Sequence, residues 1–406
     1  MDPRLNWMIS VDDHVLEPKH VWESRLPSKY REAGPRLRRD EQGEAWFYED
    51  KRSPTIGLAA VAGKKTEEFS PLPITYDDMR PGCYDPGARV EDMLRDGVLA
   101  SLCFPSFPRY CGQVFSEGQD KELGLACIRA YNDWMIDEWS GSAPGRFIPM
   151  IIMPLWDPML AATEIERTAA KGAKAIAFSE NPAQLGYPSI YDRDRYWDPV
   201  LAAANDTKLP LCTHVGSSSR LPKTSDDMPM LAVIVYASVV NMIGACTDWL
   251  FSGVLQRYPD VKLCLSEGGI GWIPYVLDRC EWTLDRHRAW GLKGEYEGDL
   301  WKGNTAAVGT GSSPMADIDP MQLFREHIYG CFITDPHGIR SLEEIGVDNV
   351  MIETDYPHSD SAWPNSLETA HNSLEGWSDE VKYKVLRGNA ERVFNFTAAA
   401  PPGAVA

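Results

Sequence analysis

Short apolar runs recur along the chain and are separated by longer stretches with helical periodicity. The runs show little alternation of apolar and polar residues, which is typical of strands buried on both faces of a parallel sheet. The strands predicted in this way cover residues 9–15, 98–104, 147–153, 173–178, 209–215, 261–266, 332–334 and 350–354.

The stretches between the later runs have the spacing of amphipathic helices. Residues 157–171 carry apolar side chains at helical spacing and are followed by Gly172, a suitable C-terminal cap. Residues 272–290 and 367–396 are also predicted to be helical. Eight strands joined by helical crossovers predict an α/β fold, specifically a (β/α)₈ TIM barrel.

Two segments interrupt this alternation of strands and helices. Residues 16–90 are rich in Pro, Arg, Glu and Asp and have no clear period, and residues 292–320 form a second irregular stretch. Connections of this length commonly cover a site, so both are predicted to be insertions over the barrel mouth. We expect residues 1–397 to form one domain and residues 398–406 to form a flexible tail.

Composition and charge narrow the choice of partners. The 406 residues are 44% hydrophobic and 24% charged, as in an ordinary globular protein, and the formal net charge is −19. This charge repels phosphate backbones and anionic lipids, so neither nucleic acid nor a membrane is an expected partner. Neither a signal peptide nor a membrane-spanning segment is expected, which predicts a cytoplasmic protein.

The nine cysteines are scattered singly and never form a CxxC pair. An odd number of isolated cysteines predicts buried free thiols, in place of disulfides or a zinc cluster.

Polar residues with metal-binding chemistry stand at the end of the first predicted strand. Asp12 and His14 are two residues apart and therefore share one face, whereas Asp13 points away. The carboxyl ends of barrel strands carry the active site, so Asp12 and His14 form half of a possible metal site. A polar strand end with a helix cap would give the same pattern.

Similar residues end three other strands. His214 follows the apolar run of the fifth strand, where a buried imidazole needs a partner. Asp355 follows the eighth strand, where a charge is costly unless it binds a cation or acts as a base, and His358 and Asp360 come next in the loop. Turn formation after Pro357 would equally account for His358 and Asp360. Glu267 ends the sixth strand, before a glycine-rich turn.

Other catalytic schemes find no support in the sequence. It contains no G-x-S-x-G elbow, no Walker loop and no HExxH, and the turn after Glu267 lacks the spacing of a dinucleotide fingerprint. His337, which follows the seventh strand, is a weaker site candidate. Trp272 and Trp363 could form apolar walls of a site, or could simply be core residues.

Together, the Asp12-x-His14 strand, His214, the Glu267-Gly-Gly turn and Asp355 resemble the amidohydrolase superfamily. More narrowly, the chain is similar to its amidohydrolase 2 branch, which includes aminocarboxymuconate semialdehyde decarboxylase. This resemblance implies that His14, His214 and Asp355 are metal ligands and that Asp12 takes the position of the first ligand. The family usually has His or Glu where this chain has Asp12, and commonly His where it has Glu267.

Both departures introduce carboxylates. Asp12, Glu267 and Asp355 with His14, His214 and a possible His358 suit Fe or Mn, often bound as a pair. This pattern resembles a small subgroup of the fold that hydroxylates C–H bonds at a dinuclear iron or iron/manganese centre. The leading hypothesis is therefore an O₂-dependent monooxygenase that needs an external electron donor. It assigns catalytic roles to Glu267, His358 and Asp355, and a further carboxylate could come from Glu67–Glu68 or Asp77–Asp78.

Two alternatives remain open. One is a hydrolase or a non-oxidative decarboxylase that uses a single Zn or Mn ion on a small carboxylic-acid substrate. The other is a metal-free structural subunit, in which the candidate ligands would not converge. The resemblance makes a homodimer, or a heteromer with a paralogue, a plausible assembly.

Overall fold

The computed structural model describes residues 2–291 and 318–402. Within these ranges, parallel strands follow one another in the orders β1-β7-β8 and β14-β13-β12-β11-β10-β9. Only Pro149 separates β8 from β9, and it has no N–H to donate to a ladder, so the two form one interrupted strand. The bounds are β1 Met8–Val15, β7 Val98–Pro105, β8 Phe147–Ile148, β9 Met150–Ile151, β10 Ala175–Ala177, β11 Leu211–His214, β12 Leu263–Ser266, β13 Ile328–Phe332 and β14 Val350–Ile352.

Backbone hydrogen bonds at the strand ends close the barrel between β14 and β1. The N–H of Asp355 donates to the carbonyl oxygen of Asp12 at 2.8 Å, and the N–H of His14 donates to that of Tyr356 at 2.7 Å. The first and last strands are therefore neighbours, which confirms the predicted (β/α)₈ barrel.

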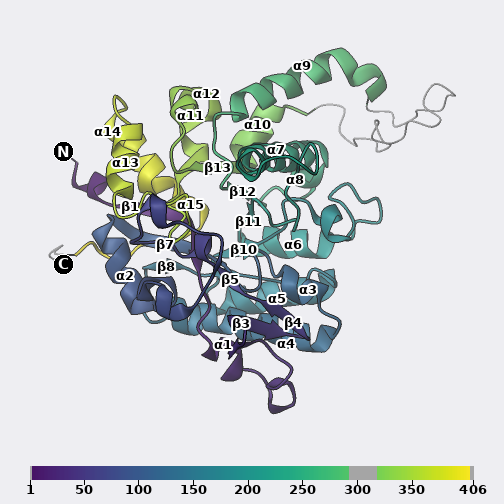
Figure 1. The fold of residues 1–406 in the computed structure, drawn as a ribbon. Helices are drawn as coiled ribbons and strands as arrows, with labels where there is room; N and C mark the ends of the chain where they lie inside the picture. Colours follow the sequence, from purple (N-terminus) through teal and green to yellow (C-terminus); the bar gives the residue numbers. More distant parts are fainter. Residues whose placement is uncertain (1, 292–317, 403–406) are drawn as a thin grey trace.

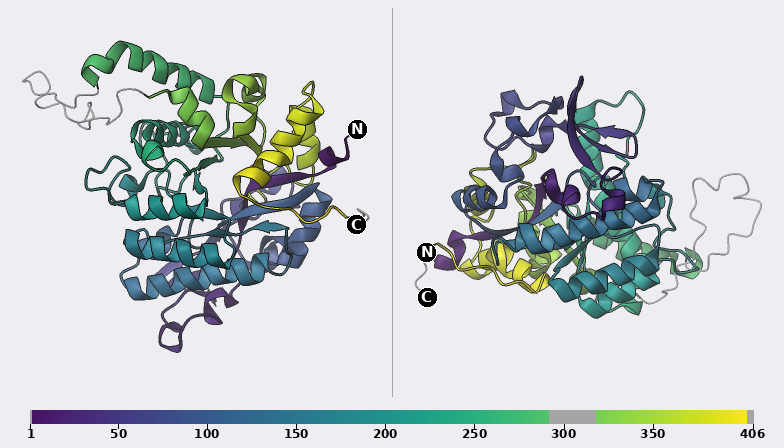
Figure 2. Two further views of the ribbon diagram at one scale, coloured as in Figure 1. Left: turned by 180° about the vertical axis from the view of Figure 1, so that it is seen from behind. Right: turned by 90° about the horizontal axis from the view of Figure 1, so that it is seen from below.

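Helices surround the parallel strands and follow them in the chain (Figures 1 and 2). Asp157 caps the N-terminus of α5 and Gly172, with φ of 110°, ends it, as the sequence predicts. The helices are α1 His20–Glu23, α2 Pro86–Arg95, α3 Gln113–Glu117, α4 Lys121–Trp134, α5 Pro158–Lys171, α6 Asp198–Thr207, α7 Met230–Phe251, α8 Val254–Arg257, α9 Ile273–Gly291, α10 Pro320–His327, α11 Pro336–Arg340, α12 Leu342–Ile345, α13 Ser366–Ser373, α14 Asp379–Tyr383 and α15 Asn389–Val393.

Two predicted elements are wrong in detail. The seventh strand was expected at residues 332–334 but runs over Ile328–Phe332, because Asp335 caps α11 and the chain has already left the sheet. The single helix expected over residues 367–396 is broken. Gly376 adopts φ of 85°, and Ser378 then caps a new helix, α14.

The insertion over residues 16–90 has regular structure that its composition concealed. It contains the antiparallel strands β2 Arg36–Asp40, β3 Gly43–Tyr48 and β4 Lys51–Ser53, and the short pair β5 Thr55–Ile56 and β6 Pro73–Ile74. Val61 in the insertion donates its N–H to the carbonyl of Pro357, at 2.9 Å, in the loop that follows β14. Part of the insertion therefore reaches the carboxyl end of the barrel.

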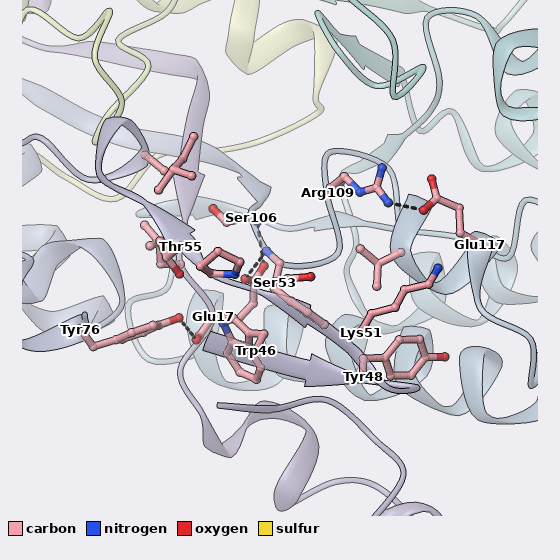
Figure 3. Close-up of a pocket in the computed structure, with 16 residues that line it drawn as sticks. Glu17, Trp46, Tyr48, Lys51, Ser53, Thr55, Tyr76, Ser106, Arg109 and Glu117 are labelled. Atoms are coloured by element: carbon pink, nitrogen blue, oxygen red, sulfur yellow. Dashed lines mark hydrogen bonds and ion pairs between the residues drawn. The ribbon is translucent and has the colours of Figure 1, made fainter. Parts of the chain in front are cut away.

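A cavity of about 340 Å³ lies between this insertion and the loop after β7 (Figure 3). We call it the aromatic cavity; its walls include Trp46, Tyr48, Tyr76 and Phe107. The buried carboxylate of Glu17 lies in its wall and accepts the backbone N–H groups of Ser106 and Phe107 at 3.0 and 2.9 Å.

Helix α7 is unusually apolar. Trp249 and Leu250 in its C-terminal half are buried, whereas Leu231 and Val235 near its start are exposed. No membrane-spanning segment is expected from the sequence, but α7 is long and apolar enough to cross a membrane by length and composition.

The remaining predictions concern the cysteines and the chain ends. All nine cysteines are free and buried, as predicted. At the start of the expected tail, the N–H of Ala399 donates to the carbonyl of Gly145 at 2.9 Å, so the tail is attached there. Residues 403–406 and most of the second insertion, residues 292–317, lie outside the described residues.

Candidate metal centre

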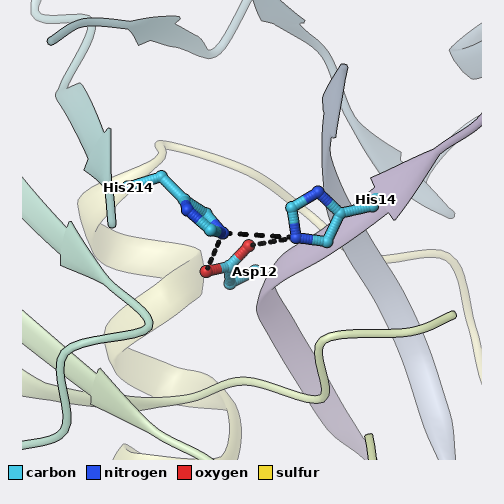
Figure 4. Close-up of side chains that lie close together, drawn as sticks. All are labelled: Asp12, His14 and His214. Atoms are coloured by element: carbon cyan, nitrogen blue, oxygen red, sulfur yellow. Dashed lines mark hydrogen bonds and ion pairs between the residues drawn. The ribbon is translucent and has the colours of Figure 1, made fainter. Parts of the chain in front are cut away.

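The ends of β1 and β11 bring two imidazoles and a carboxylate together (Figure 4). The Nε2 atoms of His14 and His214 are 3.2 Å apart. Asp12 lies between them, with Oδ1 at 3.6 Å from Nε2 of His14 and Oδ2 at 3.5 Å from Nε2 of His214. All three side chains are fully buried.

Asp355, which follows β14, lies next to this group, because the end of β14 is hydrogen-bonded to β1 where the barrel closes. Its Oδ1 lies 3.0 Å from Nε2 of His14 and 3.2 Å from Nδ1 of His358. The ring of His358 stacks on that of His14 with a centroid separation of 3.6 Å. Ligand atoms converge in two overlapping triads: Asp12, His14 and His214, and His14, Asp355 and His358.

The electrostatics of this group are those of a cation site. None of the four carboxylate oxygens of Asp12 and Asp355 receives a hydrogen bond from the described residues, although all four are buried. Nδ1 of His214 donates to the carbonyl of Val215 at 2.7 Å, which leaves the lone pair of Nε2 directed at Asp12 and His14. Buried acceptors without donors are costly unless a cation occupies the space between them. The residues present therefore fit a divalent metal ion.

The pKa shifts have the same origin. Burial, followed by repulsion from Glu353 and Asp355, raises the pKa of Asp12 well above its usual range. Burial also lowers the pKa of His214 to about 4, so its imidazole is neutral, as a metal ligand must be. We name Asp12, His14, His214 and Asp355 the metal centre.

Asp13 connects the segments that carry the metal centre by hydrogen bonds. As the alternation of β1 predicts, it points away from Asp12, and its oxygens accept the hydroxyl groups of Ser10, Ser101 and Thr354 and the N–H of Tyr356. These partners belong to β1, β7 and the segment after β14. Asp13 therefore joins the strands that carry Asp12, His14 and Asp355.

Aromatic rings restrict the two central imidazoles. Tyr110 stacks on His214 with a centroid separation of 4.1 Å, and Phe104 lies edge-on to the same ring at 5.0 Å. The sequence analysis missed both residues. Phe104 was recognised only as part of an apolar strand, and Tyr110 lies in a loop without any pattern that reveals its neighbours.

Glu267 lies beside the metal centre, against the opposite nitrogen of His214. Its Oε2 is 3.5 Å from Nδ1 of His214, whereas the two triads with converging ligand atoms do not include it. Direct ligation by Glu267 stays a prediction. Glu353, which the sequence analysis did not single out, accepts the N–H of Glu267 at 3.1 Å. A signal for Glu353 existed, since it is a second carboxylate at the same strand end, two residues before Asp355.

Other candidates lie elsewhere. His337 is exposed on α11 beside Arg340, because its helix leads away from the strand end. Trp363 donates its indole N–H to the carbonyl of Asp92 and packs on Tyr356. The proposed extra carboxylates remain at the surface: Asp77 pairs with Arg39, Asp78 caps its own turn, and Glu67 and Glu68 are exposed. Trp272, in contrast, lines a cavity together with Glu267.

A barrel with a His/Asp centre at the carboxyl ends of its strands defines a class of enzymes that use a bound metal ion. The family model described as Amidohydrolase matches residues 19–396, nearly the whole chain. The chain belongs to this family.

Among curated relatives, a gamma-resorcylate decarboxylase from Polaromonas sp. (strain JS666) is 26% identical over 293 residues, which span 66% of this chain and 75% of the relative. A 2-amino-3-carboxymuconate-6-semialdehyde decarboxylase from Dictyostelium discoideum is 23% identical over 322 residues, which span 78% of each chain.

Solved structures share the fold. An amidohydrolase from Mycobacterium avium subsp. paratuberculosis superposes with a TM-score of 0.71 at 20% identity, over 96% of this chain and 99% of the other. A 5-carboxyvanillate decarboxylase from Novosphingobium aromaticivorans, complexed with manganese and 4-hydroxy-3-methoxy-5-nitrobenzoic acid, superposes with a TM-score of 0.64 at 16% identity, over 98% of each chain.

Proposed function

We propose that this protein is a non-oxidative decarboxylase of an aromatic carboxylic acid, and that one manganese ion is held by Asp12, His14, His214 and Asp355. The observation that carries the proposal is the buried group of two carboxylates and two neutral imidazoles whose carboxylate oxygens have no hydrogen-bond donor among the described residues. The decarboxylases among its relatives support the reaction. The dinuclear hydroxylase of the leading sequence hypothesis gains no support from these relatives.

The reaction replaces a carboxylate by hydrogen. The bond between the ring carbon and the carboxyl carbon breaks, CO₂ leaves, and the electron pair that remains on the ring carbon takes up one proton. A divalent ion supplies positive charge that binds the substrate and stabilises the negative charge that develops.

The chain itself must supply the proton and exclude water. In our proposal Glu267 delivers the proton, because it lines a cavity next to His214 and its side chain is 26% exposed. Burial, followed by repulsion from Asp355 and Glu353, raises the pKa of Glu267 well above its usual range, which favours its protonated form as a proton donor. Tyr110 and Phe104 cover His214 and limit the access of water to the metal centre.

Anaerobic turnover tests this function against the hydroxylase. Protein loaded with manganese is incubated without O₂ with a set of hydroxybenzoates, and released CO₂ and bound metal are measured. We expect CO₂ release with about one manganese per chain. In Glu267→Gln we expect manganese to stay bound while the rate of CO₂ release falls by at least about 100-fold. A product that forms only with O₂ and two bound iron ions would refute the proposal.

A further inference from the structure

A cavity of about 390 Å³ opens next to the metal centre, on the side of β12 to β14. We call it the acidic cavity. Its lining includes Trp272 and the carboxyl groups of Glu267, Glu353, Asp335 and Asp360, and none of its described lining residues is Lys, Arg or His. Its volume is in the range of small-molecule sites.

The carboxylates of the acidic cavity differ in how many hydrogen bonds they accept from the protein. Asp335 is compensated, because it accepts the N–H groups of Ile270, Gly271 and Gly338. Glu353 is 3% exposed, and its Oε2 accepts the N–H of Glu267 and the thiol of Cys331 at 3.1 and 2.5 Å.

Two groups in this cavity lack partners. The other oxygen of Glu353, Oε1, has no hydrogen-bond donor among the described residues. Asp360, which is exposed, likewise has neither a hydrogen bond nor an ion pair among the described residues. A nearly buried carboxylate that lines a cavity with one oxygen unpaired indicates a ligand that donates to it.

The arrangement fits an organic cation better than a second metal ion. Among the described residues, three ligand atoms converge only in the two triads around His14, so no three acids of the cavity converge on one point as the ligands of a metal ion do. Trp272 lines the same space, and its indole N–H donates to the carbonyl of Gly268 at 2.9 Å, which fixes the ring. An indole next to carboxylates is a favourable environment for an ammonium group.

We propose that the substrate carries a protonated amino group besides the carboxylate, and that Glu353, Asp360 and Trp272 bind this ammonium group. The inference rests on the proposed function, since it assumes that the carboxylate goes to the metal centre. A second anionic group in the same place would be repelled by these carboxylates, and a neutral group would leave them without a charged partner. The acidic cavity therefore selects against dicarboxylates.

Three benzoates that differ at one position test this. The manganese-loaded protein is titrated calorimetrically at pH 7 with 3-(aminomethyl)benzoate, 3-(hydroxymethyl)benzoate and isophthalate. We expect the amine to bind at least about tenfold more tightly than the alcohol, and isophthalate to bind least tightly. In Glu353→Gln and in Asp360→Asn the preference for the amine over the alcohol should fall at least threefold, with manganese binding unchanged.

The matched control is Glu166→Gln, an exposed acid on α5, which should keep the full preference. Equal binding of amine and alcohol, tighter binding of isophthalate, or no measurable binding of the amine would overturn the inference. So would a second equivalent of manganese that is lost in Glu353→Gln. Because manganese binding and CO₂ release are measured separately, the three binding results would leave the proposed decarboxylation standing, whereas a second manganese would also contradict the single ion of the proposed function.

Discussion

The aromatic cavity and the acidic cavity both contain buried carboxylates, and they differ in what neutralises them. In the aromatic cavity, each oxygen of Glu17 accepts a backbone N–H, and Arg109 pairs with Glu117. In the acidic cavity, Oε1 of Glu353 and the carboxylate of Asp360 have no partner among the described residues. Satisfied polar groups hold a structure together, whereas unsatisfied ones are left for a ligand. The larger number of aromatic groups in the aromatic cavity therefore does not make it the active site.

The same contrast exists between two adjacent residues of β1. Asp13 receives four hydrogen bonds from three segments of the barrel, and Asp12 receives none. Both are fully buried aspartates. Because their surroundings differ, replacing each aspartate by asparagine should have opposite effects on the stability of the metal-free protein.

The largest effect is expected for Asp12→Asn. The neutral amide cannot compensate a divalent ion, so the rate of CO₂ release should fall at least about 1,000-fold. The metal-free variant should nevertheless be more stable than the metal-free wild type, by on the order of 1 kcal/mol, because a buried carboxyl group without donors is removed. Urea unfolding in the presence of a chelator measures this difference. A metal-free variant less stable than the wild type would contradict our account of Asp12.

Asp13→Asn should act in the opposite direction on stability. It weakens four hydrogen bonds and removes the charge that faces Arg89, so the free energy of unfolding should fall by about 3 kcal/mol. Urea unfolding of the metal-free protein gives this value directly. Asp206→Asn, an exposed substitution on α6, serves as the control and should leave stability unchanged. If Asp13→Asn and Asp12→Asn had the same effect, the distinction between the two aspartates would fail.

A smaller, pH-dependent effect is expected in the aromatic cavity. Burial, offset in part by the N–H groups of Phe107 and Ser106, raises the pKa of Glu17 to about 7. Between pH 4.5 and 7 the native chain keeps a proton that the unfolded chain has released, so the contribution of Glu17 to stability falls as the pH rises through this window.

Gln in place of Glu17 cannot ionise, so the Glu17→Gln variant does not lose this stability as the pH rises. From pH 5 to pH 8, its free energy of unfolding relative to wild type should rise by on the order of 2 kcal/mol. Urea unfolding at the two pH values measures the change, and manganese affinity should be unaffected at both. A relative stability independent of pH would show that Glu17 ionises freely in the native protein.

The barrel could be predicted because its strands are continuous apolar runs, which few other elements share. The convergence of Asp12, His14, His214 and Asp355 followed from one rule, that parallel strand ends meet at one rim. The antiparallel strands of the insertion were missed, because the alternation of Arg36 to Asp40 has charged residues on both faces and only Leu37 packs against the core.

The chemistry was harder to predict than the fold. The number of carboxylates at the strand ends suggested a dinuclear centre, but the sequence does not give the distances between these carboxylates that decide how many ions they can bind. Glu267 belongs to the same set of strand ends as His214, and the structure places it at the opposite nitrogen of that imidazole. Tyr110 comes from a loop after β7, and the position of such a loop depends on tertiary contacts that no local pattern encodes.

The closure of the barrel has a consequence for biosynthesis. Asp12 and His14 leave the ribosome well before Asp355 and the backbone groups after β14 that bond to β1, which lie more than 300 residues further along the chain. Until then β1 lacks one of its two neighbours, β14, and the metal centre lacks one of its two carboxylates. Domains generally begin to fold from the N-terminus during synthesis. In this protein, however, the metal centre can form only after Asp355 has been translated, so a chain that terminates before this residue cannot assemble it.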